Sequence, residues 1–347
     1  MPKTPAGFRS AIPQAEFERI LDAHNGNCYQ AAKLLGLHHR SVAARWEKVK
    51  KRRAKEEITE PQLPVFPDGD IHVDEIRQQL ARRFEKRNEL AKAKEWFDIK
   101  MPNRPFGLMI WGDPHIDSNG CNWPLLERDV EIARREGIFS LNIGDTLDNW
   151  PNGSRLVALY AHSDQSVETS HKLARWFLED SGIHWLVVLL GNHDLWPGHT
   201  NLKHLVKKPL IMESWGARFT LSCGQQKFRV WAAHDFPGHS MWNTGHGMQK
   251  AAHMKDAADL YIAGHTHNWA LHQEESASRD FTYWWARARG YKYLDDHADR
   301  LGYQPQKEGA SILAVFNPNT TSMAGRLQCF ADVEVGADYL KYLRANG

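Results

Sequence analysis

Histidine, aspartate and asparagine side chains recur at short intervals between residues 113 and 267, mostly directly after runs of apolar residues. They form five stretches, which are Asp113-Pro114-His115, Gly144-Asp145, Gly191-Asn192-His193-Asp194, His234 and Gly264-His265-Thr266-His267. Polar side chains at strand ends are where ligands usually bind in an open α/β sheet. A mixture of imidazoles, carboxylates and one amide suits borderline ions such as Mn²⁺, Fe²⁺ or Zn²⁺ better than an all-oxygen Mg²⁺ site. The pattern therefore predicts a metal centre.

The spacing of these stretches is typical of a site that holds two divalent ions. Two such ions, about 3.5–4 Å apart, screen an anionic phosphoester and lower the pKa of a shared water. Each short motif is a weak signal by itself, but all five in order are a strong one. We therefore expect metal-dependent hydrolysis of phosphoester bonds.

Residues 106–318 resemble the calcineurin-like metallophosphoesterase family, whose pattern is D-x-H, G-D-x-x-D, G-N-H-[DE], a later His and G-H-x-H. The resemblance implies an α/β fold, a layered β-sandwich flanked by helices. It assigns four ligands to one metal, which are Asp113, His115, Asp145 and His267. Asp145 bridges to a second metal, whose other ligands are Asn192, His234 and His265.

The same resemblance makes His193 the catalytic histidine, which stabilises developing charge and protonates the leaving alkoxide. Asp194 is then expected to orient His193, and Asp148 is expected to be a supporting group. His239 and His246 compete with His234 on spacing. We favour His234 because a strand end holds a ligand more rigidly than a loop does.

One departure from the family narrows the substrate. Ser/Thr phosphatases of this superfamily read G-D-x-x-D-R-G, whereas this chain continues Asp148-Asn149-Trp150. The missing arginine removes a phosphate clamp, so a protein phosphatase is disfavoured. The remaining motifs do not separate nucleases, cyclic-nucleotide phosphodiesterases and broad phosphodiesterases.

Short apolar runs alternating with helical segments predict a layered α/β domain. The expected strands are 106–111, 138–143, 185–190, 228–233, 260–263 and 311–316. The expected helices are 124–136 and 166–181. The aromatic and basic stretch 281–303 is expected to form a further helix, whose aromatic and Arg side chains either stack on bases or pack in the core.

The first 55 residues carry 12 Lys and Arg against 4 Asp and Glu, whereas the rest of the chain is acidic on balance. Three helices are expected here, at about 14–24, 27–35 and 38–53, with Asn27 and Gly36 as caps. Val42, Trp46 and Val49 form the buried stripe of the third helix. The residues expected on its outward side, as contacts to nucleic acid, are His39, Arg40, Arg45 and Lys48.

Residues 26–37 resemble the helix-turn-helix of Fis-like regulators and small phage DNA-packaging proteins, which implies DNA binding. The alternatives are a solvated basic surface or a helical hairpin that serves only for packing. We expect four segments: a helix-turn-helix domain at 1–55, a linker and charged helix at 56–100, the metallophosphoesterase domain at 101–330, and a C-terminal tail or helix at 331–347. The helix at 73–99 is either a spacer or packs through Leu80, Phe84, Leu90 and Trp96.

No apolar run is long enough to cross a bilayer, and the four cysteines are widely scattered with no CxxC pair. We therefore expect a cytoplasmic protein with free thiols and no membrane partner.

The leading hypothesis is a phosphodiesterase with two Mn²⁺, Fe²⁺ or Zn²⁺ ions, acting as a nuclease on DNA that the helix-turn-helix recruits. One rival is a small-molecule phosphatase or nucleotide phosphodiesterase. Another is a DNA-binding regulator that keeps the phosphoesterase fold only as a scaffold.

Overall fold

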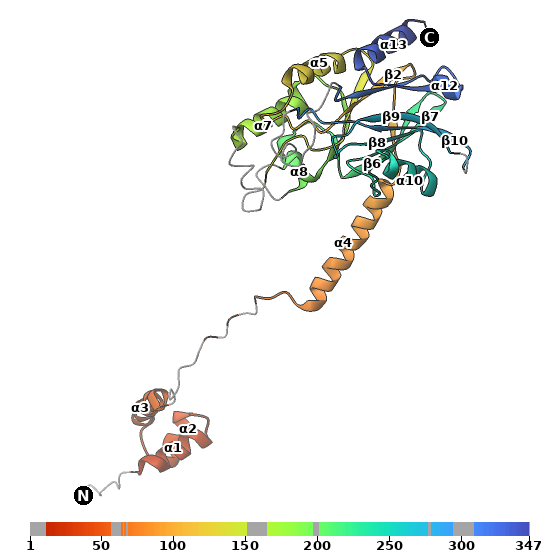
Figure 1. Ribbon diagram of the computed structural model, residues 1–347. Helices are drawn as coiled ribbons and strands as arrows, with labels where there is room; N and C mark the ends of the chain where they lie inside the picture. Colours follow the sequence, from red (N-terminus) through yellow and green to blue (C-terminus); the bar gives the residue numbers. More distant parts are fainter. Residues whose placement is uncertain are drawn as a thin grey trace, which may run out of the picture. The chain divides into compact units, whose positions relative to one another are not determined.

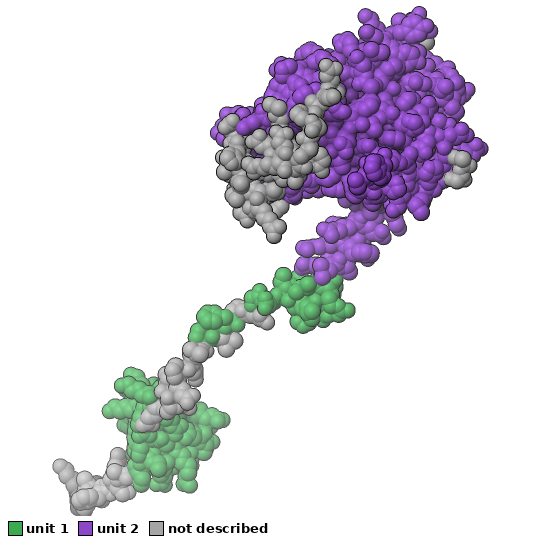
Figure 2. Space-filling view, viewed as in Figure 1, with its two compact units in different colours: residues 1–78 green, residues 79–347 purple. Residues whose placement is uncertain are grey.

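The computed structural model describes residues 12–56, 64, 66, 69–150, 165–196, 201–276, 279–293 and 309–346. The chain divides into two compact units, residues 1–78 and residues 79–347 (Figure 2). No helix in the described part of the chain is long and apolar enough to cross a membrane. The four cysteines are free thiols.

The first unit contains the three expected helices, α1 (Gln14–Ala23), α2 (Cys28–Leu35) and α3 (His39–Glu56). The Asn27 side chain accepts hydrogen bonds from the backbone N–H groups of Tyr29 and Gln30, and Gly36 ends α2 with φ of 64°. Both caps are therefore confirmed. The three helices share a small core made by Phe17, Leu21, Ala31, Ala32, Val42, Trp46 and Val49.

The charged helix α4 (Val73–Ala93) is shorter than expected. The chain then turns into a strand, β1 (Phe97–Lys100), so the prediction of helix through residue 99 was wrong at this end. Leu80, Phe84 and Leu90 are exposed, so the expected packing through these three side chains is not found. Trp96 does pack, since its indole N–H donates to Asp256.

The second unit is an α/β fold built on two six-stranded mixed sheets, ordered β1-β6-β7-β8-β10-β9 and β12-β11-β2-β3-β4-β5. The remaining strands are β2 (Phe106–Trp111), β3 (Ile138–Asn142), β4 (Trp185–Leu190), β5 (Ile211–Ser214), β6 (Gly216–Cys223), β7 (Gln226–Ala233), β8 (Leu260–Ala263), β9 (Ala270–Ser276), β10 (Phe281–Arg287), β11 (Ile312–Phe316) and β12 (Leu327–Phe330). All six strands expected from the sequence are present, within two residues at each end.

The helices of this unit are α5 (Trp123–Ala133), α7 (Val167–Arg175) continuing into the π-helical turn η1 (Trp176–Asp180), α8 (Asn192–Leu195), α9 (Leu202–Leu205), α10 (His246–Met254), α12 (Met323–Arg326) and α13 (Val333–Asn346). Both expected helices are thus found. The main core is shared by side chains from both sheets, including Leu108, Leu141, Phe219 and Val230. A second cluster packs α5, α7 and α13 on the β2 sheet, and a third packs α10 on the other sheet (Figure 1).

The prediction of a helix from residue 281 was wrong. Residues 281–287 form β10, which pairs with β8 on one side and β9 on the other. Aromatic side chains fit the pleated surface of a sheet. The interleaved arginines interrupted this strand pattern in the sequence and favoured the prediction of a helix. The part of the predicted helix between residues 294 and 303 lies outside the described residues.

The sheet order positions the polar motifs. β2, β3 and β4 are adjacent and parallel in one sheet, and β7 and β8 are adjacent and parallel in the other. The carboxyl ends of parallel neighbours lie at one edge of a sheet. The motifs that follow these five strands are therefore brought together from both sheets.

Candidate metal centre

The motif side chains converge into three groups that can hold a metal ion. The first group is Asp113, His115 and His267, the second is Asp145, His234 and His265, and the third is His115, Asp148 and His193. Within each group the donor atoms lie within 4.8 Å of one another. Asn192 joins the second group, because its Oδ1 lies 3.0 Å from His234 Nε2.

All seven residues expected as ligands therefore lie in or beside the first two groups. His239 and His246 belong to no group among the described residues. The His239 side chain is 74% exposed and lies 3.7 Å from Asp235, and His246 begins α10. His234 has no exposed surface, so the choice of His234 over the loop histidines agrees with this geometry.

Four of the candidate ligands have a strained backbone. The φ angles are 43° at His115, 50° at Asp145, 66° at His265 and 53° at His267. Residues with a Cβ rarely adopt this left-handed conformation, and such outliers cluster at functional sites. The surrounding structure must therefore hold these backbones in place.

The motif glycines are required by close approach. A Cβ on Gly191 would overlap Asp145 Oδ1, and a Cβ on Gly264 would lie 2.7 Å from Asp113 Oδ1. Only glycine lets these two loops approach the carboxylates so closely. These two glycines are thus part of the way the ligands are assembled.

The buried charges of the cluster need a positive partner. Asp113 Oδ1 is buried without a hydrogen-bond partner among the described residues. Burial opposes ionisation of Asp145, but hydrogen bonding and charge from His234 hold the pKa of Asp145 well below its usual value. Burial also opposes protonation of His234, yet Asp145 and Asp113 raise the pKa of His234 to about 10. An ionised carboxylate pair beside imidazoles fits divalent cations.

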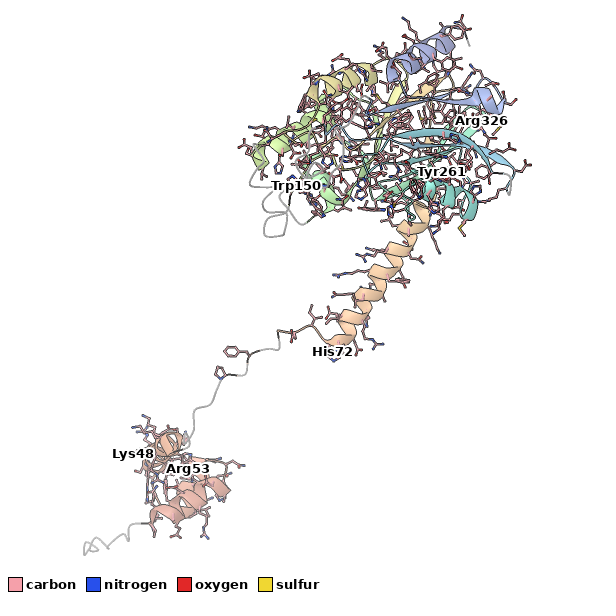
Figure 3. The ribbon with its side chains drawn as sticks, in the orientation of Figure 1. Lys48, Arg53, His72, Trp150, Tyr261 and Arg326 are labelled. Carbon is pink, nitrogen blue, oxygen red and sulfur yellow. The ribbon has the colours of Figure 1, made fainter. Side chains whose placement is uncertain are left out.

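His193 lies beside the cluster, walled by two tryptophans. Its ring is 4.9 Å from that of Trp150, which Figure 3 labels, and 4.1 Å from that of Trp196. Burial lowers the pKa of His193 to about 4. Its Nδ1 is 2.5 Å from the Asp148 carbonyl oxygen. A carbonyl only accepts, so the proton of the neutral ring belongs on Nδ1, which leaves Nε2 bare on the side of Asp145.

The expectation that Asp194 orients His193 was wrong. The Asp194 carboxylate accepts from the backbone N–H groups of Gly191 and Thr146. It therefore ties the loop after β4 to the loop after β3, while the Asp148 carbonyl contacts the His193 ring. The sequence cannot reveal this contact pattern, because adjacency to His193 in the chain does not determine where the Asp194 side chain points. Burial, with help from the charge on Asp145, raises the pKa of Asp194 to about 7.

Lys292 and Arg287 are site residues that the sequence did not reveal. The buried Lys292 ammonium donates to Asp148 Oδ1 at 3.0 Å, and the same oxygen lies 2.8 Å from His115 Nδ1. Burial disfavours the ionised form of Asp148, but Lys292 and His115 hold the pKa of Asp148 well below its usual value. Arg287 donates to the Gly264 carbonyl and to Thr266 Oγ1, which fixes the G-H-T-H loop. Both lie in the aromatic and basic stretch 281–303, but no feature of the neighbouring sequence indicates that these two side chains are buried.

The four candidate DNA contacts separate into two kinds. His39, Arg40 and Lys48 are exposed on α3. Arg45 is not available as predicted, because its guanidinium donates to Gln14 Oε1 and the Ile12 carbonyl and lies 4.1 Å from the centre of the Phe17 ring. Arg45 therefore fastens α3 to α1.

Comparisons with known proteins identify no family. No family model matches the chain, and no curated protein matches it. A hypothetical protein from Thermus thermophilus aligns at 11% identity and a TM-score of 0.34, covering 65% of this chain and 98% of that one. GAP50, the anchor in the inner membrane complex of Plasmodium, aligns at 12% identity and a TM-score of 0.35, covering 70% of this chain and 95% of that one.

Proposed function

We propose that this chain is a metal-dependent phosphodiesterase of the calcineurin-like kind, a layered two-sheet enzyme that binds two divalent ions. The observation that carries the proposal is the left-handed backbone at His115, Asp145, His265 and His267. Packing alone gives no reason to strain four residues that all present metal-binding side chains to one cluster. Their coincidence with two ligand groups favours a built metal centre over a scaffold.

The ligands divide between the two ions according to the groups. Asp113, His115 and His267 would hold one ion, and Asn192, His234 and His265 the other, with Asp145 shared. When bound, the ions supply Lewis-acid stabilisation of the phosphoester and an activated water. Mn²⁺ is the ion we favour, and the donor set also accommodates Fe²⁺ or Zn²⁺.

The protein's own groups orient this chemistry. Asp148, neutralised by Lys292, lies 2.8 Å from His115 Nδ1, which leaves Nε2 as the ring nitrogen that can bind an ion. His193 presents Nε2 on the side of Asp145. Its lowered pKa leaves the ring neutral in the metal-free protein, but a bound phosphodiester anion would favour the imidazolium. The protonated ring can then give its proton to the leaving oxygen.

The experiment that tests the activity is a screen of the purified protein with 1 mM Mn²⁺ or with EDTA. Bis-p-nitrophenyl phosphate, p-nitrophenyl phosphate, single-stranded DNA and duplex DNA serve as substrates. We expect hydrolysis of the diesters that EDTA abolishes and Mn²⁺ restores. Activity on the monoester alone would favour a small-molecule phosphatase, and no hydrolysis with any of the ions named would refute the enzyme proposal.

We also propose that the helix-turn-helix delivers the enzyme to DNA. A linked binding module raises the local concentration of phosphodiester at the active centre. Several basic residues of α3 already have partners, since Lys50 pairs with Glu47, and Arg53 with Asp22 and Glu18. Arg40 and Lys48 are exposed and have no ion pair among the described residues.

Replacing Arg40 and Lys48 together by alanine should weaken binding of the full-length protein to duplex DNA. Two lost phosphate contacts should also reduce the slope of log affinity against log salt by about 2. The measurement is fluorescence anisotropy in EDTA, which prevents cleavage. Arg19→Ala removes an exposed arginine from α1 and is the matched control. If the double variant binds as the control does, α3 is not the DNA-binding helix.

A further inference from the structure

A cavity of about 900 Å³ opens next to the second ligand group. Its walls come from the corner between β5 and β6, the end of β7 and one side of α10. Four aromatic side chains line it, which are Phe97, Trp215, Trp231 and Phe236. Volumes of this order hold one small organic ligand. None of the metal-centre chemistry described so far uses this space.

Trp215 connects the cavity to the metal centre. Its ring centre is 5.3 Å from that of His234 and 6.3 Å from that of His265. Ala233 and Asp235, the neighbours of His234 in the chain, also line the cavity. The Trp215 ring is therefore within reach of a molecule whose phosphate sits at the second ligand group.

The Trp215 backbone is held in a costly conformation. Its φ is 69°, which is a rare angle for a bulky residue, and its side chain remains 42% exposed. Its N–H donates to the Leu190 carbonyl, and its own carbonyl accepts from the His234 N–H. The indole is thus presented to solvent on a backbone fixed between β4 and a candidate ligand. An exposed aromatic on a strained backbone is typical of a functional position.

The charges around the cavity leave a net positive rim. Lys94 pairs with Glu213, and Arg218 pairs with Asp256. Lys250 and Lys255, on and just after α10, line the cavity and have no ion pair among the described residues. Lys255 Nζ lies 5.9 Å from the centre of the Trp231 ring. The rim therefore offers two available cations, and one of them, Lys255, lies beside an aromatic ring.

We propose that this cavity is a binding subsite for one unpaired nucleotide of the substrate strand, with its base on Trp215 and a neighbouring phosphate at Lys250 and Lys255. Aromatic faces and cations that follow a backbone are the chemistry that binds single-stranded nucleic acid. A base must leave its duplex partner to stack on a side chain, so single strands and frayed ends should be preferred. That the nucleotide belongs to a substrate strand rests on the proposed function, whereas the binding itself does not.

The test is the binding of a fluorescent single-stranded decanucleotide to the full-length protein with Mn²⁺, in the His193→Gln background to slow cleavage. Stacking of one base contributes about 1–3 kcal/mol, so Trp215→Ala should weaken binding by about 5- to 150-fold. Trp215→Phe keeps a flat ring and should restore most of the affinity. The same strand made entirely of abasic units should bind weakly and respond little to Trp215→Ala.

Two further variants test whether the rim lysines bind the strand specifically or only add to the positive charge of the surface. Lys250→Ala with Lys255→Ala should weaken binding of both the normal and the abasic strand. Lys172→Ala removes an exposed lysine on α7, which does not line the cavity, and should change neither. Competition with free dAMP distinguishes a site for a nucleic-acid strand from a site for a free mononucleotide. If dAMP binds as tightly as the decanucleotide does, the site is one for free nucleotides and the strand proposal is overturned.

Failure of the subsite proposal can be distinguished from failure of the proposed enzymatic activity. A fall in affinity with Trp215→Ala, rescued by phenylalanine, supports the subsite even where the wild-type protein hydrolyses no diester. Conversely, wild-type hydrolysis of single-stranded DNA combined with unchanged binding by Trp215→Ala and the double lysine variant overturns the subsite and leaves the enzyme. Thermal melting of each variant shows whether it is folded. Should Trp215→Ala fail to fold, Trp215→Gly, which removes the left-handed strain, takes its place with the same expected loss.

Discussion

Asp145→Asn is expected to abolish hydrolysis and to remove bound metal at the same time. The Asp145 carboxylate lies 3.2 Å from His234 Nε2 and 4.0 Å from His193 Nε2, and its Oδ1 also accepts from the His193 N–H. It is the one candidate ligand assigned to both ions. The asparagine amide is neutral, so it lacks the negative charge that a ligand shared by two cations needs. Asparagine tolerates the left-handed backbone required at φ of 50°, so the variant should still fold.

The measurement is metal content by elemental analysis after gel filtration, together with turnover of bis-p-nitrophenyl phosphate. Asp338→Asn makes the same chemical change at an exposed position on α13 and should alter neither quantity. A folded Asp145→Asn protein that keeps its metal and full turnover would show that the ligand assignment is incorrect.

His193→Gln is expected to leave metal bound and to lower turnover by about 10²–10⁴, the usual range for loss of a general acid. His193 is a donor only in the third group, whose carboxylate Asp148 is already paired with Lys292, so metal content should be retained. Glutamine preserves a polar side chain of similar length but cannot deliver a proton. The loss should be largest for DNA, whose alkoxide leaving group must be protonated.

The comparison that isolates proton transfer uses two diesters that differ only in the leaving group. A nitrophenolate is stable without a proton, so His193→Gln should cost much less with that substrate than with an alkyl leaving group. Equal losses with both would indicate that His193 positions the substrate or acts as a base through the bare Nε2. Trp196→Phe is the control for disturbance of the aromatic wall, since it keeps a ring beside position 193.

The sequence was sufficient to predict six of the strands, the three helices of the first unit and the grouping of the candidate ligands. Buried strands such as β2 and β4 are continuous apolar runs, and the glycine and polar residues that follow each run mark the end of the strand. Because the motifs sit at strand ends, predicting the strands also predicted which side chains meet. The caps at Asn27 and Gly36 were predictable for a similar reason, since they depend only on local backbone geometry.

Several of the site and surface residues were missed or misplaced because their contacts join residues distant in the chain. Asp148 and Lys292 are 144 positions apart, yet they form a buried ion pair at the site. Arg45 was expected on the open face of α3, but α1 reaches it through Gln14, 31 positions earlier. Helical periodicity gives the direction of a side chain relative to its own helix and cannot show what another helix places there. The cavity beside Trp215 was not predictable either, because it exists only between packed elements.

The two ligand groups each draw on both sheets. Asp113 and His115 follow β2, whereas His267 follows β8 of the opposite sheet. Asp145 follows β3, whereas His234 and His265 follow β7 and β8. A bound ion in either place would therefore be a cross-link between the two halves of the domain, as a disulfide is between two chain segments. Metal affinity and the stability of the packing between the sheets would then be thermodynamically linked, and separation of the sheets would remove both metal positions at once.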